Sequence, residues 1–210
     1  AVSALYLLYV TLALRRSHGE YLQRLDLEDE LRRQRDLFEQ QSRRDGLTGL
    51  ANRRRFSSAI EDGVKATRHD GGALVLMILD LDHFKSINDS HGHAAGDACL
   101  RGFALQLQEA FDTADDIVAR IGGEEFAVLS RSTLAHGLQR ADAFRAALAR
   151  MPHQLDNDTS LTLAVSIGVA VFDPARHVDA DAFYRDADAA LYRAKALGRN
   201  RVCASADIEG

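Results

Sequence analysis

Apolar positions along the chain change their spacing several times, and each change predicts a new element. Residues 1–14 form an almost uninterrupted apolar run, followed at once by Arg15 and Arg16. A membrane span needs about 20 apolar residues, and its cytoplasmic flank is often basic. We therefore expect a piece of a longer protein that begins inside a truncated transmembrane helix. A core helix that is apolar throughout is the alternative, and a signal peptide fits less well because its charges precede the apolar segment.

Residues 15–44 are highly charged and contain no Pro. Alternating spacings of four and three separate Leu27, Leu31, Gln34, Phe38 and Gln41. This pattern is typical of a weak coiled coil, so a helical stalk is predicted for residues 15–44. A single solvated helix is an equally good interpretation of the same residues.

Residues 45–210 alternate between helical and strand periods. Phe56, Ile60 and Val64 mark the apolar face of a helix, and residues 73–81 form a continuous apolar run that predicts a strand buried on both faces. The same reasoning predicts helices within 100–111, 134–148 and 183–194, and strands at 117–121, 126–129, 161–171 and 201–204. The strands on either side of Gly122 and Gly123 predict a hairpin. This order predicts an α/β domain with a mixed central sheet flanked by helices.

Composition limits the classes of function. The chain has 210 residues, of which 46% are hydrophobic, and this suffices for one globular domain plus an appendage. A net charge of -5 with both signs interspersed provides no large basic surface for a nucleic acid polymer. The two cysteines, Cys99 and Cys203, have no metal-ligand spacing, so packed thiols in a reducing compartment are expected.

Two acidic pairs are the candidates for chemistry. Asp80 and Asp82 lie at the carboxyl end of the predicted buried strand, an edge where open α/β sheets bind ligands. Glu124 and Glu125 follow the glycine pair in the hairpin, so both acidic pairs converge if the strands are neighbours. Oxygen ligands alone favour Mg²⁺ or Mn²⁺ over zinc. Gly122 and Gly123 are expected to take φ > 0 in a tight turn and to let a ligand lie against bare backbone.

Five segments carry a family resemblance. The segment Arg120-Ile-Gly-Gly-Glu-Glu-Phe126 matches the signature of the GGDEF family of diguanylate cyclases, in its Glu variant. Four other segments resemble that family in the same order: Asp45-Gly-Leu-Thr-Gly-Leu-Ala-Asn-Arg-Arg54, Asp80-Leu-Asp-His-Phe-Lys-Ser-Ile-Asn-Asp89, His91-Gly-His-Ala-Ala-Gly-Asp97 and Ala189-Ala-Leu-Tyr-Arg-Ala-Lys-Ala-Leu-Gly-Arg-Asn200. The resemblance covers residues 45–204 and implies the fold of the class III nucleotide cyclases, with residues 45–210 as the catalytic domain.

The resemblance also implies roles for single residues. Metal ions, two in each half-site, would be held by Asp80, the backbone carbonyl of Leu81 and Glu124. Glu124, Glu125 and Lys85 would act in catalysis, with Glu124 helping to deprotonate the attacking hydroxyl. The nucleotide would contact the guanine-reading Asn88 and Asp97, the phosphate-binding His83, Phe84, Lys195 and Arg199, and the turn at Gly122 and Gly123. An Asp carboxylate accepts from the N1–H and N2–H₂ donors of guanine, which favours GTP over ATP.

The implied reaction joins two GTP molecules into cyclic di-GMP and releases two pyrophosphates. Each domain resembles a half-site for one GTP, so a two-fold homodimer is expected, the monomer should be inactive, and the stalk could control how two domains face each other. The catalytic domain is expected in the cytoplasm and the full-length protein in the bacterial inner membrane, where an N-terminal anchor or sensor region would precede the domain.

One departure from the family and two competing functions remain. Many members carry Arg-x-x-Asp as a product-inhibition site, and here Thr113 stands in place of the Arg, with Asp116 last. We therefore expect weak or no feedback inhibition by cyclic di-GMP at this place. A non-catalytic module that binds GTP or cyclic di-GMP is one alternative, and a cyclase that makes a 3′,5′-cyclic mononucleotide is the other.

Overall fold

The computed structural model describes residues 18, 43–154 and 160–205, and the fold is that of the part from residue 43 onward. The apolar run at residues 1–14 and almost all of the stalk predicted for residues 15–44 lie outside these residues. Within the described ranges, no helix has both the length and the apolar character that crossing a membrane requires.

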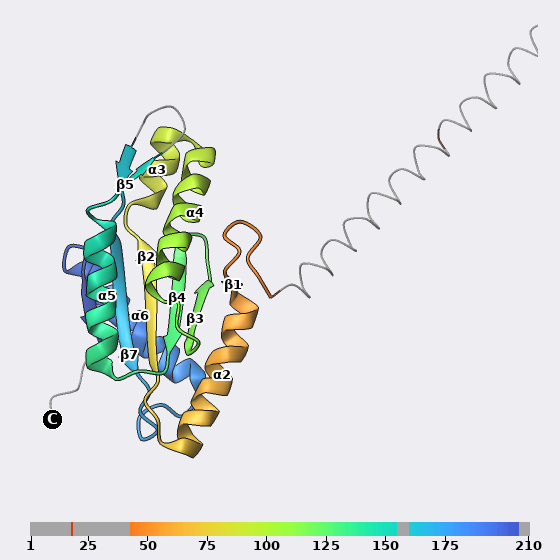
Figure 1. Ribbon diagram of the computed structural model, residues 1–210, viewed down its shortest axis with the longest axis vertical. Coiled ribbons are helices and arrows are strands. Elements are labelled where there is room, and N and C mark those ends of the chain that lie inside the picture. The colour runs from red at the N-terminus through yellow and green to blue at the C-terminus, as the bar shows by residue number, and fades with distance from the viewer. Residues whose placement is uncertain (1–17, 19–42, 155–159, 206–210) are drawn as a thin grey trace, which may run out of the picture. The chain divides into compact units, whose positions relative to one another are not determined.

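A six-stranded mixed sheet forms the centre of the domain (Figure 1). Its order is β1-β3-β4-β2-β7-β8, and the strands are β1 (Ala51–Asn52), β2 (Val75–Leu81), β3 (Asp116–Arg120), β4 (Glu125–Ser130), β7 (Val165–Val171) and β8 (Val202–Ala204). The pairs β1–β3 and β7–β8 are parallel, and the other neighbours are antiparallel. The predicted mixed sheet, its buried central strand and the β3–β4 hairpin are confirmed.

Helices cover both faces of this sheet, with α4 and α5 in front of it and α6 behind it in Figure 1. Their bounds are α2 (Arg53–Asp70), α3 (Phe84–His91), α4 (His93–Ala110), α5 (Leu134–Leu148) and α6 (Ala180–Ala196). Alternate residues of β2 separate the two cores, because successive side chains of a strand point to opposite faces. Met77 and Leu79 pack with the apolar faces of α4 and α5, whereas Leu76 and Ile78 pack with those of α2 and α6.

Side-chain caps fix where three of these helices begin. Asn52 accepts a hydrogen bond from the amide of Arg55 at the start of α2, and Asp179 accepts one from Ala182 at the start of α6. Thr133 has the same role for α5. Such caps satisfy amides that have no partner within the helix.

The structure differs from the predicted elements in two places. The strand expected at 161–171 is divided into β6 (Ser160–Thr162), which pairs with β5 (Pro152–Gln154) in a separate hairpin, and β7. The chain leaves the main sheet between them, where the carbonyl of Ala164 accepts from the amide of Asp82. The stretch after β2, for which the sequence analysis predicts no helix, contains α3, a helix of eight residues with one buried side chain, Phe84.

Candidate functional site

Three carboxylates meet where β2 ends beside β4. Asp80 is the register partner of Glu125, and the amide of Leu81 donates to the carbonyl of Glu124 over 3.3 Å. Burial raises the pKa of Asp80 above its usual value, and the charges of Glu124 and Glu125 raise it further. Lys195 of α6 opposes this shift, because its Nζ lies 2.7 Å from Asp80 Oδ2. The structure therefore places Asp80, Leu81, Glu124, Glu125 and Lys195 in one cluster.

This cluster suits a cation that is shared with a nucleotide. In the described part of the chain, no group of three or more His, Cys, Asp and Glu side chains is arranged to enclose a metal ion. Mg²⁺ does not need such an enclosure, because it keeps several waters and binds through one or two carboxylates together with substrate phosphates. Asp80, Glu124 and the carbonyl of Leu81 supply oxygen donors of this kind, and a nearby cation would favour the anionic form of Asp80, whose pKa burial raises.

Arg120 holds the glycine turn in place, a role that the sequence analysis did not assign. Its Nε and Nη2 donate to the carbonyl of Gly123 over 3.0 and 2.7 Å, and its Nη1 donates to Asp45 Oδ1 over 3.2 Å. Asp45 also accepts from the amide and hydroxyl of Thr48. Burial alone would raise the pKa of Asp45, but these bonds hold it below its usual value. Both Arg120 and Asp45 open segments with a family resemblance, and that was the available signal.

The structure gives Gly122 a different reason from the one predicted, and it gives Gly123 none. The glycines with φ > 0 are at other positions, and Gly122 and Gly123 lie outside the left-handed region, so the predicted φ > 0 is wrong. A Cβ on Gly122 would come within 2.6 Å of Glu125 Oε2, so the Glu125 carboxylate occupies the space that a side chain would take. A Cβ on Gly123 would meet no atom within 4 Å, and the surface there is open.

Asp82 lies near the acidic cluster in sequence, but its carboxylate is hydrogen-bonded within the protein. Its Oδ1 accepts from Ser166 Oγ over 2.7 Å, and its Oδ2 accepts from the amide of Asn200 over 2.9 Å. The residue is buried, and both carboxylate oxygens have donors within the protein. Asp82 is one of the four acids that the sequence analysis names as candidates for chemistry, and burial and two hydrogen bonds connect its carboxylate to the fold.

The residues expected at phosphates come from the segment directly after β2 and from the end of α6 with the turn after it. His83, with φ of 59°, is the N-cap residue of α3, which begins at Phe84 and carries Lys85 exposed in its first turn. The first amides of a helix have no intrahelical partner and attract anions. Arg199 is exposed in the turn that follows α6, four residues after Lys195.

The residues expected at guanine come from two adjacent helices. Asn88 lies on α3 and Asp97 on α4, and both are partly buried. A Cβ on Gly96 would overlap Asn88 Oδ1, so the Asn88 side chain lies directly against α4, one residue before Asp97. The structure thus brings together two hydrogen-bonding side chains that the sequence separates by nine positions.

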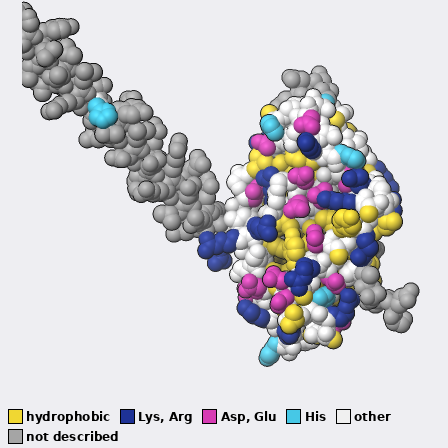
Figure 2. Space-filling view, turned by 180° about the vertical axis from the view of Figure 1, so that it is seen from behind, with side chains coloured by type: hydrophobic (Ala, Val, Ile, Leu, Met, Phe, Trp, Pro, Cys, Tyr) yellow, Lys and Arg dark blue, Asp and Glu magenta, His cyan; other side chains and the backbone are white. Residues whose placement is uncertain are grey.

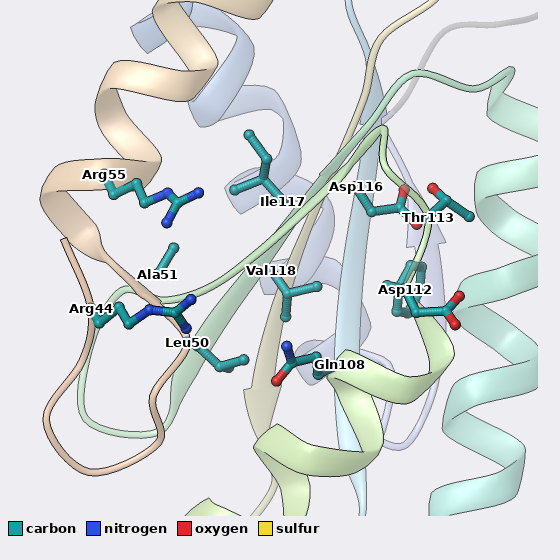
Figure 3. A pocket seen from close by; sticks show the side chains of 11 residues that line it. Arg44, Leu50, Ala51, Arg55, Gln108, Asp112, Thr113, Asp116, Ile117 and Val118 are labelled. Atoms are coloured by element: carbon teal, nitrogen blue, oxygen red, sulfur yellow. The ribbon is translucent and has the colours of Figure 1, made fainter.

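A separate pocket of about 250 Å³ lies at the edge of the sheet formed by β1 and β3 (Figure 3). Arg44 and Arg55 line one side, and Thr113 and Asp116 line the other. None of the residues of the acidic cluster lines this pocket. On the face drawn in Figure 2, acidic and basic side chains are interspersed rather than gathered by sign.

Comparison with known proteins gives a consistent result. The family model described as "Diguanylate cyclase, GGDEF domain" matches residues 42–201. The chain is 43% identical over 159 residues to diguanylate cyclase DgcP of Pseudomonas aeruginosa, a match that covers 75% of this chain and 23% of the relative. It is 38% identical over 160 residues to the probable diguanylate cyclase DgcC of Escherichia coli K12, which covers 76% of this chain and 42% of that protein.

A solved structure shows the same fold. The GGDEF domain of DgcB from Caulobacter crescentus, solved in complex with c-di-GMP, aligns with a TM-score of 0.74 and 32% identity. The alignment covers 79% of this chain and 94% of that domain. The chain spans less than half the length of the two curated relatives, so only this one domain is compared.

Proposed function

Because the chain belongs to the diguanylate cyclase GGDEF-domain family, we propose that it condenses two GTP molecules into cyclic di-GMP. The observation that carries the proposal is the cluster of Asp80, Glu124 and Glu125 at the paired ends of β2 and β4, with Lys195 against Asp80. A triphosphate needs cations beside carboxylates, and the cluster provides both in one place. Asn88 and Asp97 support the choice of guanine.

Each condensation step forms one phosphorus–oxygen bond and breaks another. The 3′-hydroxyl of one GTP attacks the α-phosphorus of the other, pyrophosphate leaves, and the hydroxyl proton passes to a base, for which Glu124 is the candidate. Two such steps close the ring. Lys85, Lys195, Arg199 and the first amides of α3 oppose the negative charge on the phosphate oxygens.

Asp80, Glu124 and the Leu81 carbonyl are the residues that would hold Mg²⁺ or Mn²⁺. A bound divalent cation would stabilise the charge that develops on the phosphates and lower the pKa of a hydroxyl bound to it. To reach the outer phosphates, Lys195 would have to exchange its ion pair with Asp80 for a contact with the nucleotide.

The proposal extends to the assembly and its place in the cell. One domain offers one acidic cluster, and two GTP molecules have to meet, so a two-fold homodimer is the working unit. GTP is available in the cytoplasm, where the domain would act. An anchor in the inner membrane and a stalk that orients the two domains rest on the patterns at residues 1–14 and 15–44.

The test is product identity. Purified protein incubated with Mg²⁺ and GTP should yield cyclic di-GMP by mass spectrometry, and ATP should yield no dinucleotide. Asp80→Asn and Glu124→Gln should each lower the rate about 100-fold or more, as expected for the loss of a catalytic group. Glu109→Gln, an exposed carboxylate on α4, is the matched control and should retain the rate.

Other outcomes would identify the competing functions. A 3′,5′-cyclic mononucleotide as the product would indicate the other class of cyclase. Tight binding of GTP or cyclic di-GMP without turnover would indicate a binding module. A wild-type rate in Glu124→Gln would contradict the proposed role of the cluster.

A further inference from the structure

Asp82 is buried at the end of β2, where it connects two parts of the chain. The residue is only 6% exposed, and its carboxylate accepts one hydrogen bond on each oxygen. Ser166 of β7 donates to Oδ1, and the amide of Asn200 donates to Oδ2. Asn200 belongs to the turn between α6 and β8, 118 positions further along the chain.

This α6–β8 turn, residues 197–201, has a backbone that needs support. Gly198, Arg199 and Asn200 have φ values of 109°, 62° and 44°, a run of left-handed conformations that is unfavourable for residues with a side chain. The amide of Arg199 donates to the carbonyl of Ala194, and the carbonyl of Arg201 accepts from the amide of Ile167. Between these two residues, the amide of Asn200 donates to Asp82.

The end of α6 and the turn after it are attached at two points to the segment where β2 ends. Lys195, at the end of α6, pairs with Asp80, and Asn200 pairs with Asp82 two residues further along. The first attachment has to open when Lys195 turns to a nucleotide. The second involves no group that contacts the nucleotide and can persist throughout.

We propose that Asp82 is a positioning residue that clamps the α6–β8 turn to the end of β2, so that Lys195 and Arg199 face the outer phosphates of the nucleotide. The inference rests on the proposed function for the identity of the nucleotide. It assigns to the second acid of the Asp-x-Asp segment a role distinct from that of the first, which is placed to contact a cation.

A double-mutant cycle tests this role. The affinity of the full chain for a non-hydrolysable GTP analogue with Mg²⁺ is measured by calorimetry for wild type, Asp82→Ala, Arg199→Ala and the double variant. Each single variant should weaken binding about tenfold, the scale of a lost charge-assisted contact. Because Asp82 acts through Arg199 and its neighbours, the double variant should be no more than about twofold weaker than Arg199→Ala.

Three controls separate positioning from general damage. Asp82→Asn keeps an acceptor for the amide of Asn200 and should restore most of the affinity. Ser166→Ala removes only the bond to the other oxygen and should have little effect. GMP has no outer phosphates, so its dissociation constant, measured by competition against a labelled analogue, should be the same for Asp82→Ala and wild type. Thermal melting confirms that each variant is folded.

Several results would overturn the inference. These are independent, multiplicative effects of Asp82→Ala and Arg199→Ala, an equal loss of GMP and analogue binding, and an Asp82→Asn variant as weak as Asp82→Ala. The proposed function fails separately, through product identity: a wild-type protein that binds the analogue but makes no cyclic di-GMP would leave the role of Asp82 intact.

Discussion

Single buried carboxylates in this domain differ in their surroundings, and their pKa values follow those differences. Burial would raise the pKa of Asp116, but hydrogen bonds, above all from Arg140, hold it below its usual value. At Asp80, burial and the charges of Glu124 and Glu125 outweigh Lys195, and the pKa is raised. Arg140 therefore stabilises the anionic form of Asp116 within the fold, whereas an additional cation would stabilise the anionic form of Asp80.

His153 on β5 leads to a prediction about acid stability. It is buried, and within the described residues its Nε2 has no hydrogen-bond partner. Burial lowers its pKa below the ordinary value of 6.5. As the pH falls through 6.5, the unfolded chain binds a proton that the folded chain does not, so the free energy of unfolding decreases until the folded pKa is reached. The loss should approach about 1.4 kcal/mol per pH unit within this window.

Urea unfolding at pH 7.5 and 5.5 measures this effect. His153→Leu should lose less stability than wild type between these two pH values, because it has no group to protonate. His69→Leu, an exposed histidine on α2, should behave like wild type. Equal acid sensitivity of wild type and His153→Leu would show that His153 does not contribute.

For single residues, the sequence indicated which residues belong to the candidate site better than it indicated the physical role of each. Asp80 and Glu124 could be found because contiguous segments carry them, and strand periodicity placed both at one edge. Asp82 could not be separated from Asp80, since its donor Asn200 lies far along the chain. The need for glycine at 122 likewise depends on where the Glu125 side chain folds back, which no local pattern encodes.

Among the elements, the loop between α4 and β3 occupies the position of the family's product-inhibition segment. Arg140 of α5 donates to both oxygens of Asp116, over 3.2 and 2.7 Å, and its guanidinium lies 4.5 Å from the centre of the Phe111 ring. The Asp116 side chain is fully buried. The acid of this segment is thus committed to α5, and Thr113 brings no guanidinium to it.

We expect cyclic di-GMP to leave the initial rate unchanged when it is added at the concentration of the substrate. Thr113→Arg restores the missing guanidinium beside the pocket of Figure 3 and should introduce inhibition that added GTP does not relieve. Initial rates over a product titration measure both. Non-competitive inhibition of the wild type that is abolished by Asp116→Asn would contradict the prediction.

Long periodic elements could be predicted, whereas the short elements β1, α3 and β5 could not. The apolar faces of α2, α5 and α6 repeat over several turns, so their spacing identifies them. Helix α3 has eight residues and buries only Phe84, which is too few for a period to emerge. The break between β6 and β7 follows from tertiary contacts of Ala164 rather than from any Gly or Pro.

For the whole molecule, the sheet is what assembles the candidate site. Strands β2 and β4 bring the acids together, α3 and α4 bring Asn88 beside Asp97, and α6 brings Lys195 to Asp80. All of these groups occur once in each domain. Under the proposed function, a single domain would hold one nucleotide in this arrangement, and a product made from two nucleotides would require two domains.

Mixing wild type with Glu124→Gln tests this requirement. In a half-site dimer, a mixed pair cannot close the ring, because one of the two condensation steps lacks its base. After subunit exchange at equal concentrations, only about one quarter of the pairs are fully wild type, and cyclic di-GMP formation should fall to about that fraction of the undiluted rate. Domains that act alone would retain about one half. A rate near one half in the mixing experiment would contradict the requirement. In a dilution series, specific activity should rise with protein concentration, in step with the dimer mass measured by light scattering.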